Sequence, residues 1–151
     1  MFALESGRTS ILVTIKRIYE GTYEGLTEPD PRIAIVGVTS LAAQHLQVPT
    51  LRQFLGMPKH NLSPTDWKHY LEENKMKVNK LKQVEVLLID EFTRIPPSEV
   101  DRISEFLSRV RGRDSVFGGI LVVATGDYYE VPPSDLSPSN CYVPRNSRQF
   151  Q

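Results

Sequence analysis

The chain has 151 residues, enough for one domain with a sizeable core, and its apolar fraction of 40% and charged fraction of 24% are those of an ordinary globular protein. Eighteen basic and eighteen acidic residues cancel, so net charge gives no support for nucleic-acid binding, and only a local patch can supply it. The single cysteine, Cys141, excludes an internal disulfide and a cysteine-based zinc site. No apolar run approaches the ~20 residues of a membrane span, and no signal-peptide pattern opens the chain. We therefore expect an intracellular domain without a membrane partner.

The first half of the chain alternates between helical periodicity and a short apolar run. Gly21 is suited to end the first helix, and the residues from Gly21 to Pro31 are typical of a loop because they are rich in Gly, Thr, Glu and Pro. The predicted elements are a helix around Ile11–Tyr19, a buried strand at Arg32–Val38, and short helices at Ser40–Leu46 and Thr50–Leu55.

The second half continues the alternation. A helix starts at Ser63 and Pro64 and continues to about Lys82, because Pro suits the first helical position. Ser98 and Asp101 form a capping-box pattern that opens another helix, which Gly112 ends. Two apolar runs predict buried strands, and they lie at Val84–Ile89 and Ile120–Thr125.

Strands that alternate with helices predict an α/β domain with a parallel sheet flanked by helices. We expect this domain to occupy residues 1–134. Pro, Ser and Asn dominate from Ser134 onward without periodicity, so residues 135–151 are predicted to form a loose tail.

Acidic residues follow the first of the two C-terminal strands. Asp90 and Glu91 end the apolar run VEVLLI. Mg²⁺ prefers hard oxygen ligands, so Asp90 is a candidate metal ligand. The neighbouring Glu91 is suited to orient and deprotonate a water that attacks a phosphate. The pair alone is also compatible with a strand that ends at the surface.

The second strand leads into a Gly–Asp turn. Gly126 and Asp127 follow the run ILVVAT, and Glu130 lies in the loop before the segment Val131–Pro133. The carboxyl ends of parallel strands meet at one edge of a sheet, so Asp127 and Glu130 are expected beside Asp90. A Pro-stiffened loop without a functional role is the alternative for this turn taken alone.

Two further segments place small polar residues at helix starts. Ser6, Gly7, Arg8 and Thr9 precede the first helix and partly match a phosphate loop, although the first Gly of that motif would fall at Phe2. Thr39 and Ser40 follow the strand at Arg32–Val38, where hydroxyls and helix N-terminal amides can bind a phosphate. Taken alone, the first segment is better explained as an ordinary helix start and the second as plain helix capping.

Together these segments resemble the first RecA-like domain of the Pif-type helicases, in the RecD-like branch of superfamily one (1B). The resemblance spans about residues 3–134. It is carried by the segments SGRTSIL (Ser6–Leu12), VTSLAAQHL (Val38–Leu46), TLRQFLG (Thr50–Gly56), LLIDEF (Leu87–Phe92), FGGILVVATGD (Phe117–Asp127) and VPP (Val131–Pro133).

The resemblance implies a RecA-like P-loop NTPase fold and a motor that couples ATP hydrolysis, with Mg²⁺, to 5′–3′ movement along single-stranded DNA. It also implies roles for individual residues. Ser6, Gly7, Arg8 and Thr9 would lie in the phosphate loop, Thr9 and Asp90 would share the Mg²⁺, and Glu91 would be the catalytic base. Asp127 and Glu130 would lie in the motif that senses the γ-phosphate, and Thr39, Ser40, Thr50 and Arg52 would touch DNA.

The chain departs from the family pattern at several of these positions. Arg8 replaces the phosphate-loop Lys, Phe2–Ser6 replace its early glycines, Glu130 replaces a Gln, and Arg52 replaces a His. The adenine-contacting segment and the second RecA-like domain are also missing from the sequence. The resemblance therefore predicts a helicase motor domain with weak or absent turnover, completed by a second helicase domain or a companion chain. A degenerate helicase-like domain that binds nucleic acid or protein, or a different P-loop ATPase, are the alternatives.

Overall fold

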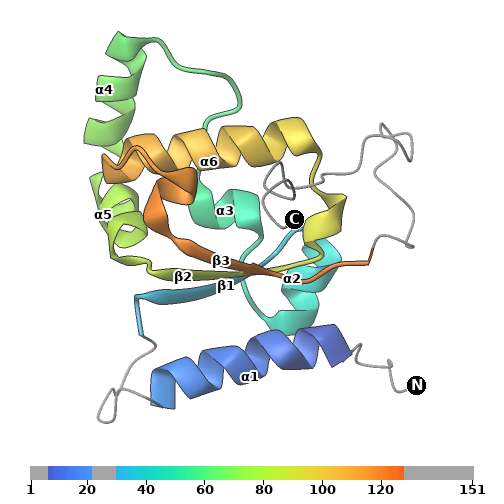
Figure 1. The fold of residues 1–151 in the computed structure, drawn as a ribbon. Helices are drawn as coiled ribbons and strands as arrows, with labels where there is room; N and C mark the ends of the chain where they lie inside the picture. Colours follow the sequence, from blue (N-terminus) through green and yellow to red (C-terminus); the bar gives the residue numbers. More distant parts are fainter. Residues whose placement is uncertain (1–6, 22–29, 128–151) are drawn as a thin grey trace, which may run out of the picture.

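The computed structural model describes residues 7–21 and 30–127, and within them three parallel strands form one sheet in the order β1-β2-β3. Figure 1 shows helices on both faces of this sheet, which confirms the predicted α/β class. The strands are β1 (Ile33–Gly37), β2 (Val86–Asp90) and β3 (Leu121–Ala124). The helices are α1 (Gly7–Gly21), α2 (Ser40–Leu46), α3 (Leu51–Leu55), α4 (Pro64–Glu73), α5 (Lys75–Gln83) and α6 (Pro97–Arg111), with the short 3-10 helices η1 (Phe92–Arg94) and η2 (Val116–Gly119).

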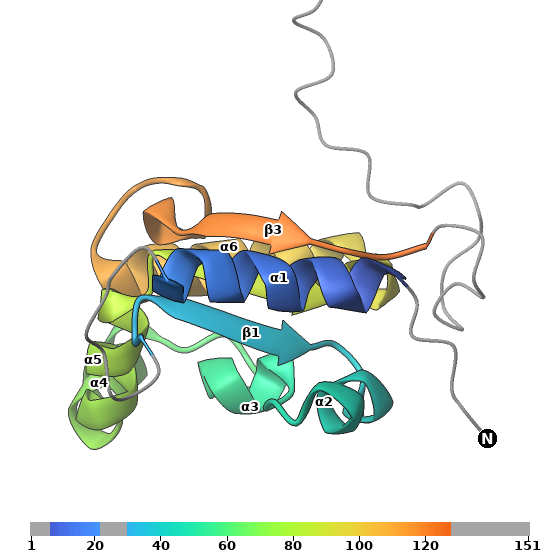
Figure 2. The same cartoon turned by 90° about the horizontal axis from the view of Figure 1, so that it is seen from below.

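The central strand β2 is buried along its whole length and separates two cores. Alternate residues of a strand point to opposite faces. Leu87 and Ile89 therefore join the larger core under α3, α5 and α6, while Val86 and Leu88 join the smaller core under α1. Figure 2 shows α1 lying along the sheet on that second face.

Helix α6 closes the larger core with one apolar stripe. The four residues predicted to form it are all buried, together with Phe106: Val100, Ile103, Leu107 and Val110. The helix ends at Gly112, which adopts a left-handed φ of 62° and donates its backbone N–H to the carbonyl of Arg109. The stripe and the stop were both readable from the sequence.

The predicted capping box at the start of α6 is wrong. The helix begins at Pro97 with Pro96 as its N-cap, and no side chain caps it. Ser98 is therefore already inside the first turn. A proline at the first helical position has a suitable φ and lacks the N–H that would need a partner, so the Pro96–Pro97 pair starts the helix earlier than Ser98 would.

The helix predicted from Ser63 to Lys82 is two helices. Ser63 caps α4 as predicted, because its hydroxyl accepts the backbone N–H of Asp66. The chain then breaks at Asn74, whose side-chain amide donates to the carbonyl of Tyr70 at 2.9 Å. The backbone N–H of Asn74 shares this carbonyl, but its φ of −107° and ψ of 27° leave the helical range and end α4.

The prediction that β3 is a buried strand is also wrong. Leu121 is 62% exposed, and Ala124 is exposed at the other end of the strand. Among the described residues β3 pairs only with β2, so it lies at an edge of the sheet. None of the described helices combines the length and apolar character needed to cross a bilayer.

Candidate functional site

The ends of β2 and β3 meet at the carboxyl edge of the sheet. Asp90 closes β2 and is only 7% exposed. Its Oδ1 accepts a hydrogen bond from Thr125 Oγ1 at 2.8 Å and another from the backbone N–H of Glu91 at 3.0 Å. The Thr125 contact ties the carboxylate of one strand to the end of the next. The structure therefore brings together the two acidic strand ends that the sequence singles out.

Glu91 follows directly and has an unusual backbone. Its φ of 59° and ψ of 34° lie in the left-handed region, which residues other than glycine adopt rarely. Thr39 Oγ1 donates to Glu91 Oε2 at 2.5 Å, and Arg94 Nε lies 3.7 Å from the same oxygen. Two groups from different segments thus hold this carboxylate at the edge.

Thr39 connects this edge to helix α2. Its hydroxyl oxygen accepts the backbone N–H of Ala42 at 3.1 Å, which caps the helix, while the hydroxyl hydrogen goes to Glu91. Ser40 is the exposed first residue of α2. The backbone N–H of Val38 donates to the Asp90 carbonyl at 3.0 Å, so the loop into α2 lies directly beside the end of β2.

Thr50 also lies at this edge, because it forms an isolated parallel bridge with Gly37 at the end of β1. It caps α3 with its own hydroxyl and with the reciprocal side chain of Gln53. Arg52, two residues later, is 82% exposed, and its Nη2 lies 3.5 Å from Glu99 of α6. Thr39, Ser40 and Thr50 thus lie in the segments that follow β1, and Arg52 adds an exposed guanidinium in α3.

The turn that contains Gly126 and Asp127 packs against Thr93 of η1, next to the end of β2. The hydroxyl of Thr93 donates to the Asp127 carbonyl at 3.3 Å. A Cβ at Gly126 would lie 2.6 Å from that hydroxyl oxygen, so only glycine fits against Thr93. The close approach of η1 to this turn sets the course of the chain after β3.

Sequence reasoning missed three residues at this edge, namely Thr125, Thr93 and Arg94. Thr125 offered a weak signal, because a Thr that directly follows an apolar run at a strand end can donate to a neighbouring carboxylate. Thr93 and Arg94 gave none. Their roles depend on the left-handed turn at Glu91, which turns η1 back toward β3.

The predicted phosphate loop is described only in part. Helix α1 begins at Gly7, so Gly7, Arg8 and Thr9 form its first turn and do not precede the helix as predicted. Figures 1 and 2 show this end of α1 on the side of the sheet to which the strands point. Ser6 and Glu130 lie outside the described residues.

The donor chemistry of the edge suits a hard cation. Asp90 offers a carboxylate that is ordered by two hydrogen bonds, one of them from the hydroxyl of Thr125, and carboxylate and hydroxyl oxygens are donors that Mg²⁺ prefers. Among residues 7–21 and 30–127, no three His, Cys, Asp or Glu residues gather as a metal cluster. A metal held at Asp90 would therefore need substrate oxygens and water as further ligands.

Comparison with known proteins gives a consistent set of relatives. No protein-family model matches the chain. The ATP-dependent DNA helicase PIF1 of Emericella nidulans is 32% identical over 106 residues, which are 70% of this chain and 14% of that protein. The ATP-dependent DNA helicase RRM3 of Saccharomyces cerevisiae is 30% identical over 128 residues, or 85% of this chain and 17% of that protein. The chain thus spans about a sixth of the length of these relatives.

Solved structures agree with the sequence relatives. The Pif1 helicase from Candida albicans superposes with a TM-score of 0.65 at 26% identity, over 84% of this chain and 28% of that one. Pif1 from Bacteroides, solved in complex with ADP-AlF3 and ssDNA, gives a TM-score of 0.60 at 27% identity, over 89% of this chain and 28% of that one. Both likenesses extend over most of this chain.

Proposed function

Since this chain belongs to the family of Pif1-type DNA helicases and shares the fold of their RecA-like domain, we propose that it is the first motor domain of such a helicase and binds ATP and single-stranded DNA. The observation that carries the proposal is the 2.8 Å hydrogen bond between Thr125 and Asp90, which joins two acidic strand ends at one edge of the sheet. A Bacteroides Pif1 solved with ADP-AlF3 and ssDNA supports both kinds of ligand.

In this proposal Asp90 and Thr9 hold a Mg²⁺ ion, which neutralises phosphate charge when it is bound. Glu91 acts as the general base that orients and deprotonates the attacking water. Its neighbours Thr39 and Arg94 support this role, because they fix the position of the carboxylate. Asp127 and Glu130 complete the γ-phosphate side, and Ser6, Gly7 and Arg8 complete the phosphate loop.

The DNA surface of the proposal is the polar patch at the end of β1. Thr39, Ser40 and Thr50 present hydroxyl groups there, and Arg52 adds an exposed cation. Hydroxyl, guanidinium and helix N-terminal groups are the usual partners of backbone phosphates. Because Thr39 also contacts Glu91, the DNA surface and the proposed base share one hydrogen bond.

We expect ATP turnover by this chain alone to be absent or very slow. Arg8 has a planar guanidinium where the family has the compact ammonium of Lys, and Glu130 has a carboxylate where the family has the neutral amide of Gln.

Unwinding needs a second motor domain or a companion chain, since translocation requires two domains that open and close on ATP. An intracellular location follows if DNA is the ligand. The alternative function is a degenerate domain that keeps the fold and binds nucleic acid or protein, which the same two departures favour.

The test is an ATPase assay on the purified chain with and without single-stranded DNA, compared with Glu91→Gln. We predict that the wild type does not exceed the Glu91→Gln background, because the phosphate loop and the γ-phosphate motif both depart from the family. DNA-stimulated turnover that Glu91→Gln abolishes would contradict slow turnover and identify the chain as a working motor.

A further inference from the structure

A cavity lies at the amino-terminal edge of the sheet, opposite the edge that carries Asp90. Its volume is about 550 Å³, which is within the usual range for small-molecule sites. Residues from the starts of β1 and β2 and from the ends of α5 and α6 line it. The charged ones are Asp30, Arg32, Lys82, Glu85, Arg111 and Arg113.

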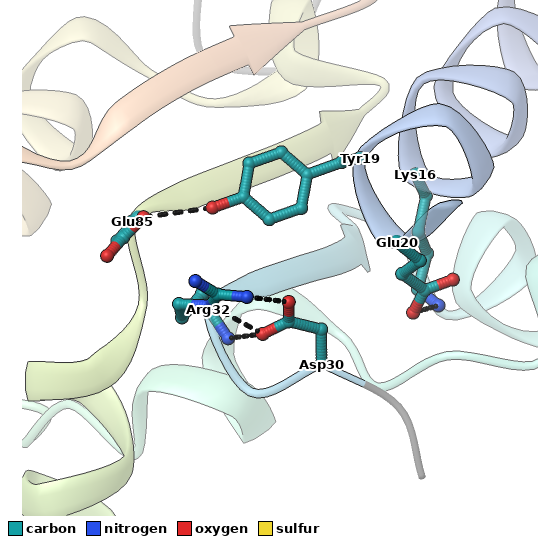
Figure 3. A network of polar contacts seen from close by, with 6 residues as sticks. All are labelled: Lys16, Tyr19, Glu20, Asp30, Arg32 and Glu85. Atoms are coloured by element: carbon teal, nitrogen blue, oxygen red, sulfur yellow. Dashed lines mark hydrogen bonds and ion pairs between the residues drawn. The ribbon is translucent and has the colours of Figure 1, made fainter. Parts of the chain in front are cut away.

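Both acidic residues of this cavity are already engaged. Asp30 is 3% exposed and accepts hydrogen bonds from Arg32, at 3.0 Å from Nε and 2.6 Å from Nη2. Glu85 accepts a hydrogen bond from the hydroxyl of Tyr19 at 2.9 Å. Figure 3 shows these two contacts side by side at the starts of β1 and β2. Asp30 is therefore paired with another residue of the wall, and Glu85 is held by a tyrosine of α1.

Arg111 is locked into the wall by backbone carbonyls. Its Nε donates to Gly118 at 2.7 Å, and its Nη1 donates to Leu81 at 2.8 Å and Val84 at 2.6 Å. These acceptors are neutral, so they fix the guanidinium without cancelling its charge. Burial and then the positive charge of Arg113 lower the pKa of Arg111, while the carboxylate of Glu85 acts in the opposite direction.

Lys82 and Arg113 complete the positive wall. Within the described residues, the side chain of neither makes an ion pair or a hydrogen bond. Four cationic and two acidic side chains leave an excess of two positive charges in a chain whose net charge is zero. Basic residues are common in the last turn of a helix, where they meet the negative end of its dipole. That effect does not explain Arg113, which lies beyond the Gly112 cap.

We propose that this cavity binds the phosphate groups of an anionic ligand, through Lys82, Arg113 and the fixed guanidinium of Arg111. Four of the six charged residues of its described lining are cations, so the ligand is recognised through phosphate charge, as carried by a pyrophosphate-like anion or by a nucleic-acid backbone. The site lies on the opposite edge from the proposed nucleotide site and does not depend on it.

The test is an NMR titration of inorganic pyrophosphate into the ¹⁵N-labelled full chain at constant ionic strength. Saturable shifts are expected at the backbone amides of Lys82, Glu85 and Arg113. The double variant Lys82→Gln/Arg113→Gln should bind about tenfold more weakly, because it loses two charge-assisted contacts. The matched control Lys68→Gln/Arg17→Gln removes the same two charge types elsewhere and should bind like the wild type.

Absence of saturable shifts at these amides, or equal weakening in the control, would overturn the proposal. A short oligothymidylate then identifies the source of the phosphate. If it displaces pyrophosphate from the same amides and does so less at high salt, the ligand is a nucleic-acid backbone. If it leaves those amides unshifted while pyrophosphate binds, the ligand is a free anion. Both outcomes support the site, and neither depends on events at the carboxyl edge.

Discussion

At the scale of single residues, Thr39 carries two tasks at the candidate site. Its oxygen caps α2 and its hydrogen holds Glu91, whose left-handed backbone needs local support. A hydroxyl is the smallest side-chain group that accepts and donates at once. The residue therefore links the stability of α2 to the orientation of the proposed base.

Replacing this hydroxyl tests the link. Thr39→Val removes both contacts and should lower the free energy of unfolding by about 1–2 kcal/mol, as expected for the loss of a cap and a hydrogen bond. Thr39→Ser keeps the hydroxyl and should stay within about 0.5 kcal/mol of the wild type. Urea denaturation measures both. Equal losses in the two variants would mean that the methyl group, and not the hydroxyl, matters.

Asp30 gives a prediction for pH. The side-chain hydrogen bond from Arg32 holds the pKa of Asp30 below its ordinary value of 3.8, although burial acts in the opposite direction. A carboxyl whose pKa is lower in the folded state stabilises the fold above its unfolded pKa, and this contribution is lost as the pH falls through the folded pKa.

Asp30→Asn should therefore be less stable than the wild type at neutral pH. The difference should stay constant as the pH falls toward 3.8 and shrink below that value, because the wild-type carboxyl then becomes protonated. Denaturation midpoints of the two proteins across this range provide the measurement. A difference in stability that grows on acidification would mean that folding does not lower the pKa of Asp30.

At the scale of elements, the close approach of α2 to β1 positions the polar edge. A Cβ at Gly37 would lie 2.4 Å from the backbone N of Ala43 and 2.9 Å from the carbonyl carbon of Ala42. Both are backbone atoms of a helix, so neither can move aside as a flexible side chain would. Gly37 therefore lets α2 pack against the end of β1 and brings Thr39 within reach of Glu91.

Gly37→Ala should separate the two elements and lower the free energy of unfolding by about 1–3 kcal/mol, the usual effect of overpacking. Gly21→Ala is the matched control, because no atom lies within 4 Å of the added Cβ. Its stability should be unchanged or slightly raised, since alanine favours a helix. A neutral Gly37→Ala variant would show that α2 is free to shift.

Periodicity was sufficient to predict most of the elements. The body of α1 and its end at Gly21, the strands β1 and β2, and the helices α2 and α3 all follow from apolar spacing and capping residues, whereas the start of α1 at Gly7 was not predicted. The break at Asn74 and the start of α6 at Pro97 were missed, because local side-chain and proline chemistry overrode the wider pattern. The exposure of β3 was missed because an apolar run does not reveal which neighbours the strand has in space.

The candidate site was predictable to a similar degree. Asp90 and Asp127 could be predicted because each follows a strand, and parallel strands end at the same edge of a sheet. Thr125 contacts the carboxylate of Asp90, and Thr39 and Arg94 contact that of Glu91. The contacts of Glu91 depend on its left-handed backbone, which no sequence pattern predicted. The acidic residues at the strand ends were thus easier to predict than the side chains that orient them.

At the scale of the whole molecule, the sheet separates two polar edges with different chemistry. The carboxyl edge gathers Asp90, Glu91 and Thr125 with the start of α1, and the amino-terminal edge gathers cations around Arg111. The family relationship bears on the first edge, and only the charges of this chain bear on the second. The central claim is that Asp90 marks a site for Mg²⁺ and nucleotide.

An NMR titration with Mg²⁺·ADP, on the wild type and on Asp90→Asn, tests that claim most directly and also detects weak binding. Asn retains an oxygen that can accept the hydrogen bonds from Thr125 and Glu91, so the fold should be preserved while the negative charge is lost. We expect Mg²⁺-dependent shifts at the amides of Glu91, Phe92 and Asp127 in the wild type and their loss in the variant. Nucleotide shifts that need no Mg²⁺, or that persist in Asp90→Asn, would contradict it.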